Sequence, residues 1–197
     1  MTHPKEPMAP APTTEQLKMI QSQAECLFTP ETVDQILDRL AARVAGELGD
    51  QIPVILCVMN GALPLVGALL SRWDFLLELD YVHATRYGQE TTGGQLHWRA
   101  LPQLSLEGRT VLVVDDIFDE GKTLDAIIKW CESAGAMAVK SCVLVDKMHD
   151  RKADDIRRPD FVGLQVEDNY LFGCGMDYKG FFRNLRGIYA LPPGGAD

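Results

Sequence analysis

The sequence contains no C-x-x-C pair, and its five cysteines are widely spaced. An odd number of scattered cysteines disfavours both a disulfide framework and a zinc site. The four histidines show no metal-ligand spacing either. We therefore expect free, buried thiols and a protein of the reducing cytoplasm.

Positive charge is also scarce. The chain has 19 lysine and arginine residues against 28 aspartate and glutamate residues, so its formal net charge is −9. This acidic balance disfavours a surface that coats nucleic acid. It remains compatible with a small anionic ligand, provided that a cation helps to bind it.

Signals for secretion and for membrane insertion are missing. Residues 1–12 hold four prolines and no basic segment followed by an apolar stretch, which predicts a flexible tail rather than a signal peptide. Residues 52–71 are uncharged, but Asn60, Gly61 and Pro64 interrupt them. A strand, a turn and a short helix explain this run better than a membrane span, so no membrane partner is expected.

The rest of the chain alternates between strand and helix patterns. Its 197 residues suit one domain, which we place at 13–197. Strands that alternate with helices predict an α/β fold with a mainly parallel sheet flanked by helices. The expected helices cover residues 13–24, 30–48, 63–72 and 123–134, and the expected strands cover 53–59, 75–85, 110–114 and 139–145, with further short strands in 161–191.

The strongest functional signal is the segment VLVVDDIFDEGKTL at residues 111–124. In an open parallel sheet, ligands bind beyond the carboxyl ends of the strands. A loop that leads from a strand into a helix presents backbone N–H groups to an anion, and the helix dipole adds to this attraction. Gly121 allows the backbone to approach closely, and Thr123 offers a hydroxyl group. This half of the motif predicts a phosphate cradle.

Three carboxylates, those of Asp115, Asp116 and Asp119, stand in the same segment. They would repel a phosphate unless they accept hydrogen bonds from sugar hydroxyls, hold Mg²⁺ or take a proton. A phosphorylated ribose bound with Mg²⁺ satisfies all of these roles. A Walker A loop is excluded, because the glycine that it requires five residues before Gly121 is Asp116.

This segment resembles the ribose-phosphate-binding motif of the type I phosphoribosyltransferases, and it is similar within them to the hypoxanthine-guanine branch. The resemblance covers roughly residues 28–190. It implies a core of about five mostly parallel strands at residues 28–160 and a small hood, mainly residues 161–191 with some early chain, that covers the base. It also implies that Asp115 and Asp116 hold the ribose hydroxyls and the metal, and that Asp119 exchanges a proton with N7 of the purine. The residues implied for the ribose phosphate are Asp115, Asp116, Asp119, Glu120, Gly121, Lys122 and Thr123.

Two further segments resemble the pyrophosphate loop and the lid of this family. Asn60 and Gly61 follow a buried strand and open a helix, and the resemblance implies backbone contacts to pyrophosphate and a cis peptide bond between Met59 and Asn60. Arg86 and Tyr87 open a polar loop that matches the lid, although relatives usually have Ser-Tyr there. A closed lid would exclude water from the reaction centre.

The purine site is implied by matches near the end of the chain. The family lysine that donates to the exocyclic oxygen at C6 corresponds to Lys147, which selects 6-oxopurines over adenine. Tyr170 matches the aromatic ring that stacks on the base, and the backbone of Leu171 meets the purine edge. Asp177 matches a carboxylate near the second Mg²⁺ and the C2 side of the base, and Arg183 matches a pyrophosphate contact.

One residue departs from the family inside its best motif. Glu120 stands where relatives commonly have threonine. Because an acid beside a phosphate is unfavourable, we expect backbone amides to hold the phosphate and Glu120 to face solvent.

The implied activity is Mg²⁺-dependent transfer of a phosphoribosyl group from 5-phospho-α-ribose 1-diphosphate to hypoxanthine or guanine, in a homodimer or homotetramer. Two alternatives remain. One is an enzyme of the same fold that prefers xanthine, and the other is a non-catalytic regulator that senses nucleotides and binds RNA. The residues Asp119, Lys147 and Asp177 favour an enzyme, and the acidic charge disfavours RNA binding.

Overall fold

The computed structural model describes residues 11–86, 96–152 and 155–192. The predicted lid residue Tyr87 and most of the predicted flexible tail lie outside these ranges. Arg86, the other residue predicted for the lid, is the last residue of a strand.

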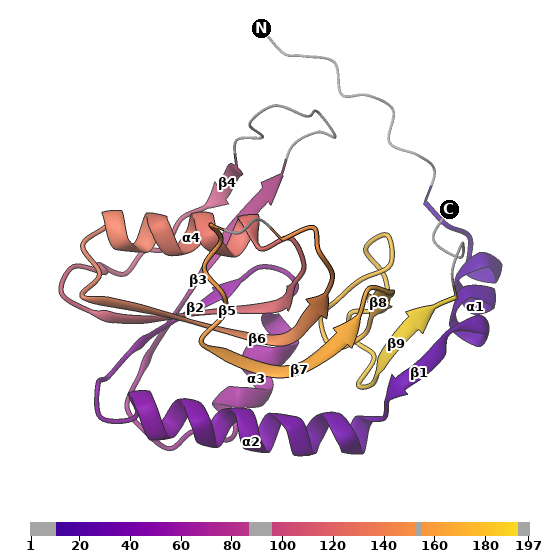
Figure 1. Cartoon of the computed structure of the whole chain (residues 1–197), viewed down its shortest axis with the longest axis horizontal. Coiled ribbons are helices and arrows are strands. Elements are labelled where there is room, and N and C mark those ends of the chain that lie inside the picture. The colour runs from indigo at the N-terminus through magenta and orange to yellow at the C-terminus, as the bar shows by residue number, and fades with distance from the viewer. Residues whose placement is uncertain (1–10, 87–95, 153–154, 193–197) are drawn as a thin grey trace, which may run out of the picture.

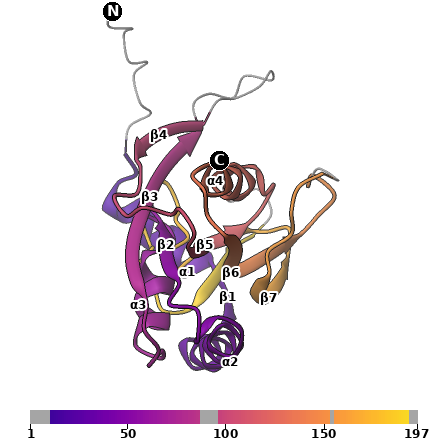
Figure 2. The ribbon, with the colours of Figure 1, turned by 90° about the vertical axis from the view of Figure 1, so that its left-hand side faces the viewer.

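A six-stranded sheet in the order β4-β3-β2-β5-β6-β7 forms the centre of the molecule. All neighbouring strands are parallel except β3 and β4, which are antiparallel. Figures 1 and 2 show helix α4 against one face of the sheet, and α2 and α3 against the other. The strands are β2 (Val54–Val58), β3 (Glu78–Arg86), β4 (Leu96–Ala100), β5 (Thr110–Phe118), β6 (Ala138–Met148) and β7 (Phe161–Glu167), and the helices are α2 (Pro30–Leu48), α3 (Leu63–Leu70) and α4 (Lys122–Ser133).

Local sequence explains why these elements form. The Thr29 hydroxyl accepts a hydrogen bond from the Thr32 amide, and Pro30 occupies the first turn of α2, as the sequence predicts. The buried residues of α2 recur at helical spacing, so one face of the helix packs on the sheet. All five residues of β2 are buried, as expected for a strand covered on both faces. The buried residues of α2 are Val33, Ile36, Leu37, Leu40, Ala41, Val44 and Leu48.

A second, three-stranded sheet in the order β1-β9-β8 forms the hood beside the carboxyl end of the main sheet (Figure 1). Its antiparallel strands pack with helix α1 around a small aromatic cluster that contains Phe172 and Tyr178. The elements are α1 (Thr14–Gln23), β1 (Glu25–Phe28), β8 (Tyr170–Phe172) and β9 (Ile188–Leu191).

The structure corrects four details of the prediction. The central sheet has six strands rather than about five, because it includes β4, which was not expected, and β7, which was placed in the hood. Strand β7 pairs with β6, so the segment 161–167 belongs to the central sheet and not to the hood. Strand β5 extends to Phe118, which places Asp115 and Asp116 on the strand instead of in the loop. Cys26 is exposed, whereas the other four cysteines are buried; all five are free.

No helix among the described residues is long and apolar enough to cross a membrane.

Candidate active site

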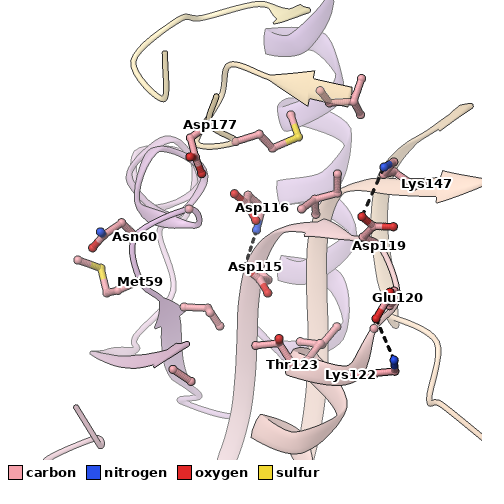
Figure 3. A pocket seen from close by; sticks show the side chains of 18 of the residues that line it. Met59, Asn60, Asp115, Asp116, Asp119, Glu120, Lys122, Thr123, Lys147 and Asp177 are labelled. Atoms are coloured by element: carbon pink, nitrogen blue, oxygen red, sulfur yellow. Dashed lines mark hydrogen bonds and ion pairs between the residues drawn. The ribbon is translucent and has the colours of Figure 1, made fainter. Parts of the chain in front are cut away.

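A cavity of about 740 Å³ lies at the carboxyl ends of β2, β5 and β6, between the central sheet and the hood. This is the edge where a parallel sheet is expected to bind its ligand. The structure brings all the predicted site residues that it describes to this cavity, apart from Arg86, whose side chain is not described. Figure 3 shows the labelled side chains around the cavity, with the carboxylates of Asp115, Asp116 and Asp177 among them.

Two adjacent buried carboxylates lie at the end of β5. The side chain of Asp115 accepts a hydrogen bond from the Asp116 amide at 3.0 Å. Burial, and the negative charge of Asp116, raise the pKa of Asp115 well above its ordinary value, and burial also raises the pKa of Asp116. Among the residues that the structure describes, the cation nearest to the pair is Arg183, whose Nη1 lies 4.0 Å from Asp116 Oδ2. The site therefore concentrates acidic groups whose charge a cation or hydroxyl donors would stabilise.

This charge leads to a prediction about stability. The folded protein raises the pKa of Asp115. The protonated carboxyl therefore contributes its full stabilisation of the fold below the unfolded pKa, and this contribution is lost as the pH rises through the folded pKa. Asp115→Asn is neutral at every pH and keeps an oxygen that accepts the Asp116 amide hydrogen. It is expected to raise the melting temperature of the ligand-free protein at pH 8, by about 2–4 °C for each kcal/mol of repulsion removed.

Calorimetry of both proteins between pH 8 and pH 5 checks this expectation. The difference in melting temperature should shrink as the pH falls towards the raised pKa of Asp115. A variant that melts below the wild type at pH 8 would mean that the charged pair stabilises the fold.

The loop after β5 is built to bring backbone amides to the cavity. Gly121 has φ +81° and precedes α4, and no side chain in the described part of the chain caps the N-terminus of this helix. A Cβ at Gly121 would lie 2.5 Å from the Phe118 ring and 2.8 Å from Ile156, so a larger residue would displace the loop. The uncapped amides of the first turn can therefore bind an anion. Glu120 forms an ion pair of 3.0 Å with Lys122 (Figure 3).

The loop after β2 lies directly beside the acidic pair. Its Met59–Asn60 peptide bond is cis, as the resemblance implies. A Cβ at Gly61 would lie 2.0 Å from Asp116 Oδ2, so a larger residue at this position would force the Asp116 carboxylate to move. Backbone groups of this loop and the carboxylates of β5 thus line the same part of the cavity.

The hood supplies the opposite wall. Arg183 Nη2 lies 2.5 Å from Asp177 Oδ1, and Arg183 Nη1 donates to the Gly175 carbonyl at 2.6 Å. The Tyr170 side chain is 41% exposed, packs edge-on against Tyr178 and donates its hydroxyl hydrogen to the Asp177 carbonyl at 3.3 Å. One face of the Tyr170 ring is therefore available to a planar ligand.

Lys147 and Asp119 connect the two halves of the cavity. The Lys147 side chain is buried, and its Nζ lies 3.4 Å from Asp119 Oδ2 and 3.0 Å from Asp168 Oδ1. Lys147 therefore holds an ammonium group at the cavity wall, at the point where Asp119 enters from the β5–α4 loop.

Several residues around the cavity were missed by the sequence reasoning. Arg99 lines the cavity from β4, a strand that was not expected, and its charge adds to the effect of burial in lowering the pKa of His83. Around Asp119 the structure adds His149, Arg151 and Asp168. The only sequence signal for His149 was its position two residues after Lys147, because its spacing matches no metal motif.

Two groups of side chains at the cavity could hold a metal ion, and the first consists of the residues predicted for Mg²⁺. Carboxylate oxygens are the protein ligands that Mg²⁺ prefers, and Asp115, Asp116 and Asp177 present them around a site with excess negative charge. Asp119, His149 and Asp168 also place ligand atoms within 4.8 Å of one another. There, however, Lys147 and Arg151 already pair with the carboxylates, and their charges oppose a bound cation. The residues predicted for Mg²⁺ thus fit it better than this second group.

The cavity combines paired carboxylates at a strand end, a glycine loop that enters a helix, and a hood, an arrangement that suits a phosphorylated sugar beside a planar group. The sequence model of the phosphoribosyl transferase domain family matches residues 27–179, and the chain belongs to this family. The predicted type I phosphoribosyltransferase fold is thereby confirmed.

Individual relatives have names that are more specific than the family name. The chain is 34% identical to a hypoxanthine-guanine phosphoribosyltransferase of Bacillus subtilis over 168 residues, which cover 85% of this chain and 92% of the relative. It is 32% identical to a hypoxanthine-guanine-xanthine phosphoribosyltransferase of Tritrichomonas foetus, over 85% of this chain and 91% of the relative. The crystal structure of a hypoxanthine phosphoribosyltransferase from Staphylococcus aureus matches with a TM-score of 0.82 at 28% identity, over 89% of this chain and 95% of the other.

Proposed function

We propose that this protein is a Mg²⁺-dependent enzyme of purine salvage. It transfers the 5-phosphoribosyl group from 5-phospho-α-D-ribose 1-diphosphate to hypoxanthine or guanine, and it releases IMP or GMP and diphosphate. The proposal rests on one observation: a single cavity joins the carboxylate pair and the amide loop to Lys147 and Tyr170. The names of the relatives support the choice of purine substrates.

The residues divide the work along the cavity. Amides of the loop 119–123 bind the 5′-phosphate, and Asp115 and Asp116 accept hydrogen bonds from the ribose hydroxyls. The amides at Asn60 and Gly61, together with Arg183, bind the diphosphate. Asp115, Asp116 and Asp177 would hold Mg²⁺, which would supply positive charge to stabilise the leaving diphosphate.

The purine lies between the hood and the end of β6. Tyr170 stacks on its ring, the backbone of Leu171 meets its edge, and Lys147 donates to the exocyclic oxygen at C6. Asp119 accepts the N7 proton as the new glycosidic bond forms. Adenine carries an amino group at C6, which would meet the Lys147 ammonium donor to donor, so the site rejects it.

A spectrophotometric assay with hypoxanthine, guanine, xanthine and adenine, each with and without Mg²⁺, tests the proposal. We expect turnover of hypoxanthine and guanine that requires Mg²⁺, and none of adenine. Turnover of adenine alone, or of no purine at all, would refute it.

A preference for xanthine is the nearest alternative, since the relative from Tritrichomonas foetus is named for all three 6-oxopurines. The same assay separates it from the main proposal. A non-catalytic regulator is disfavoured because Asp119, Lys147 and Asp177 are all present and all line the cavity.

Stacking of the base on Tyr170 gives a second prediction. Tyr170→Ala is expected to raise the KM for the purine about 5- to 150-fold, because base stacking on an aromatic ring contributes roughly 1–3 kcal/mol. Tyr170→Phe keeps the ring and loses only the 3.3 Å hydrogen bond to the Asp177 carbonyl, so its KM should stay within a few-fold of the wild type. Steady-state kinetics with guanine decide the matter: equal losses in the two variants would exclude stacking.

We also propose that the enzyme acts in the cytoplasm as a homodimer or homotetramer. Its free thiols are compatible with a reducing compartment. Leu63 in α3 and Leu79 and Tyr81 in β3 are about half exposed, and apolar side chains of this size favour burial against another subunit. Sedimentation velocity at micromolar concentration distinguishes these oligomers from a monomer.

A further inference from the structure

His149 makes the shortest contact that holds Asp119. Its side chain is only 4% exposed, although it immediately follows β6 and lies in a charged segment. Its Nε2 lies 2.6 Å from Asp119 Oδ1. The two cations beside Asp119 are farther away, because Lys147 Nζ and Arg151 Nη2 each lie 3.4 Å from its carboxylate oxygens.

The second nitrogen of the ring determines the direction of this hydrogen bond. The backbone N–H of Arg151 donates to His149 Nδ1 at 3.0 Å. A ring nitrogen that accepts a hydrogen bond carries no hydrogen, so the single hydrogen of the neutral imidazole resides on Nε2. His149 therefore donates its Nε2–H to Asp119 Oδ1.

The segment that carries His149 is itself anchored. The buried Lys152 ammonium pairs with Asp146 and donates to the Lys147 carbonyl, and it lies 4.8 Å from the centre of the Phe118 ring. The guanidinium of Arg151 pairs with Asp168. Lys152 thus anchors the segment to β6, and Arg151 anchors it to the chain after β7. The imidazole is therefore held in place as a hydrogen-bond donor.

We propose that His149 is a positioning residue for Asp119 in the transfer reaction, an inference that rests on the proposed function. His149 does not line the cavity, whereas Asp119 and Lys147 do. By holding Oδ1, the imidazole fixes the rotation of the carboxylate and leaves Oδ2 directed towards Lys147, on the side where the purine binds. Lys147 cannot perform this task alone, since its ammonium must also turn to the purine oxygen.

Two substitutions separate the hydrogen bond from the bulk of the ring. The amide nitrogen of glutamine reaches about as far as histidine Nε2, whereas the asparagine amide reaches only the position of Nδ1. His149→Asn is expected to lower kcat about 10-fold, which is the order of effect for one lost hydrogen bond to a charged group. His149→Gln should stay within 3-fold of the wild type. The KM for 5-phosphoribose 1-diphosphate should change less than 3-fold in both variants, because neither substitution changes a residue of the loop 119–123.

A measurement that needs no catalysis tests the same contact. A long-range ¹H–¹⁵N correlation spectrum of the free wild-type protein at neutral pH reports which ring nitrogen of each histidine carries hydrogen. We expect the Nε2–H tautomer for His149, assigned by the signal that disappears in His149→Gln, and a shift of that signal in Asp119→Asn. An Nδ1–H or doubly protonated ring would overturn the proposal, and so would equal kcat in wild type, Asn and Gln variants.

The two proposals can fail separately. If the wild-type protein transfers no phosphoribosyl group to any purine, the proposed function is refuted, and the spectrum still decides whether His149 donates to Asp119. If the wild-type protein is active and His149→Asn retains full kcat, only the positioning role is refuted.

Discussion

Asp119→Asn is expected to lower kcat for hypoxanthine and guanine by about 10²- to 10⁴-fold, the range typical of a lost general acid or base. Asparagine preserves the size of the side chain and can still accept the His149 hydrogen bond, but it cannot take up the N7 proton. Backbone amides of the loop 119–123 are proposed to bind the 5′-phosphate, so the KM for 5-phosphoribose 1-diphosphate should change little. Pre-steady-state kinetics with rapid quenching measure the chemical step directly.

Asp150→Asn is the matched control for this change. Asp150 is exposed, belongs to the same charged segment as His149 and does not line the cavity. The same loss of one negative charge should leave kcat within 2-fold of the wild type, since salt and solvent screen an exposed charge. Near-normal turnover in Asp119→Asn would instead show that proton transfer at N7 does not depend on this carboxylate.

The parts of the molecule that could be predicted are those encoded locally. The cap at Thr29 and the apolar periodicity of α2 depend on residues three or four positions apart, so the sequence is sufficient to place that helix. The acidic pair and Gly121 form one continuous segment, so their proximity follows from the chain itself. The predicted cis bond before Asn60 came from the family resemblance and not from a local pattern.

The parts that were missed depend on contacts between distant segments. Strand β4 is recognisable only through its antiparallel register with β3, in which Thr85 faces His97. Strand β7 carries no mark that assigns it to the central sheet until its pairing with β6 is known. Likewise, His149 has a role only because it meets Asp119, 30 positions earlier in the chain. Local patterns contain no information about such pairings, which tertiary packing decides.

Gly175 also acts through contacts between distant segments, because it lies where the hood meets the loop that contains Gly61 (the Gly61 loop). Gly175 has φ +104°, and a Cβ there would lie 1.9 Å from the carbonyl oxygen of Gly61. Its amide donates to the Arg183 carbonyl at 3.0 Å, and its own carbonyl accepts from the Arg183 guanidinium. One residue therefore sets the spacing between the Gly61 loop and Arg183, the two groups proposed to bind diphosphate.

Gly175→Ala must move one of these groups, because the colliding atom belongs to the backbone and cannot rotate away. Each charge-assisted contact to the diphosphate contributes roughly 1.5–3 kcal/mol. Loss of two such contacts corresponds to a rise of at least about 100-fold in the KM for 5-phosphoribose 1-diphosphate. Gly108→Ala is the control: Gly108 also has a positive φ, +68°, but nothing lies within 4 Å of its added Cβ. Left-handed strain alone costs about 1–2 kcal/mol, so Gly108→Ala should lower the melting temperature while it leaves the KM unchanged. A KM near the wild-type value in a folded Gly175→Ala protein would mean that the hood and the Gly61 loop can separate without loss of diphosphate binding, and that the two groups do not act on the same ligand.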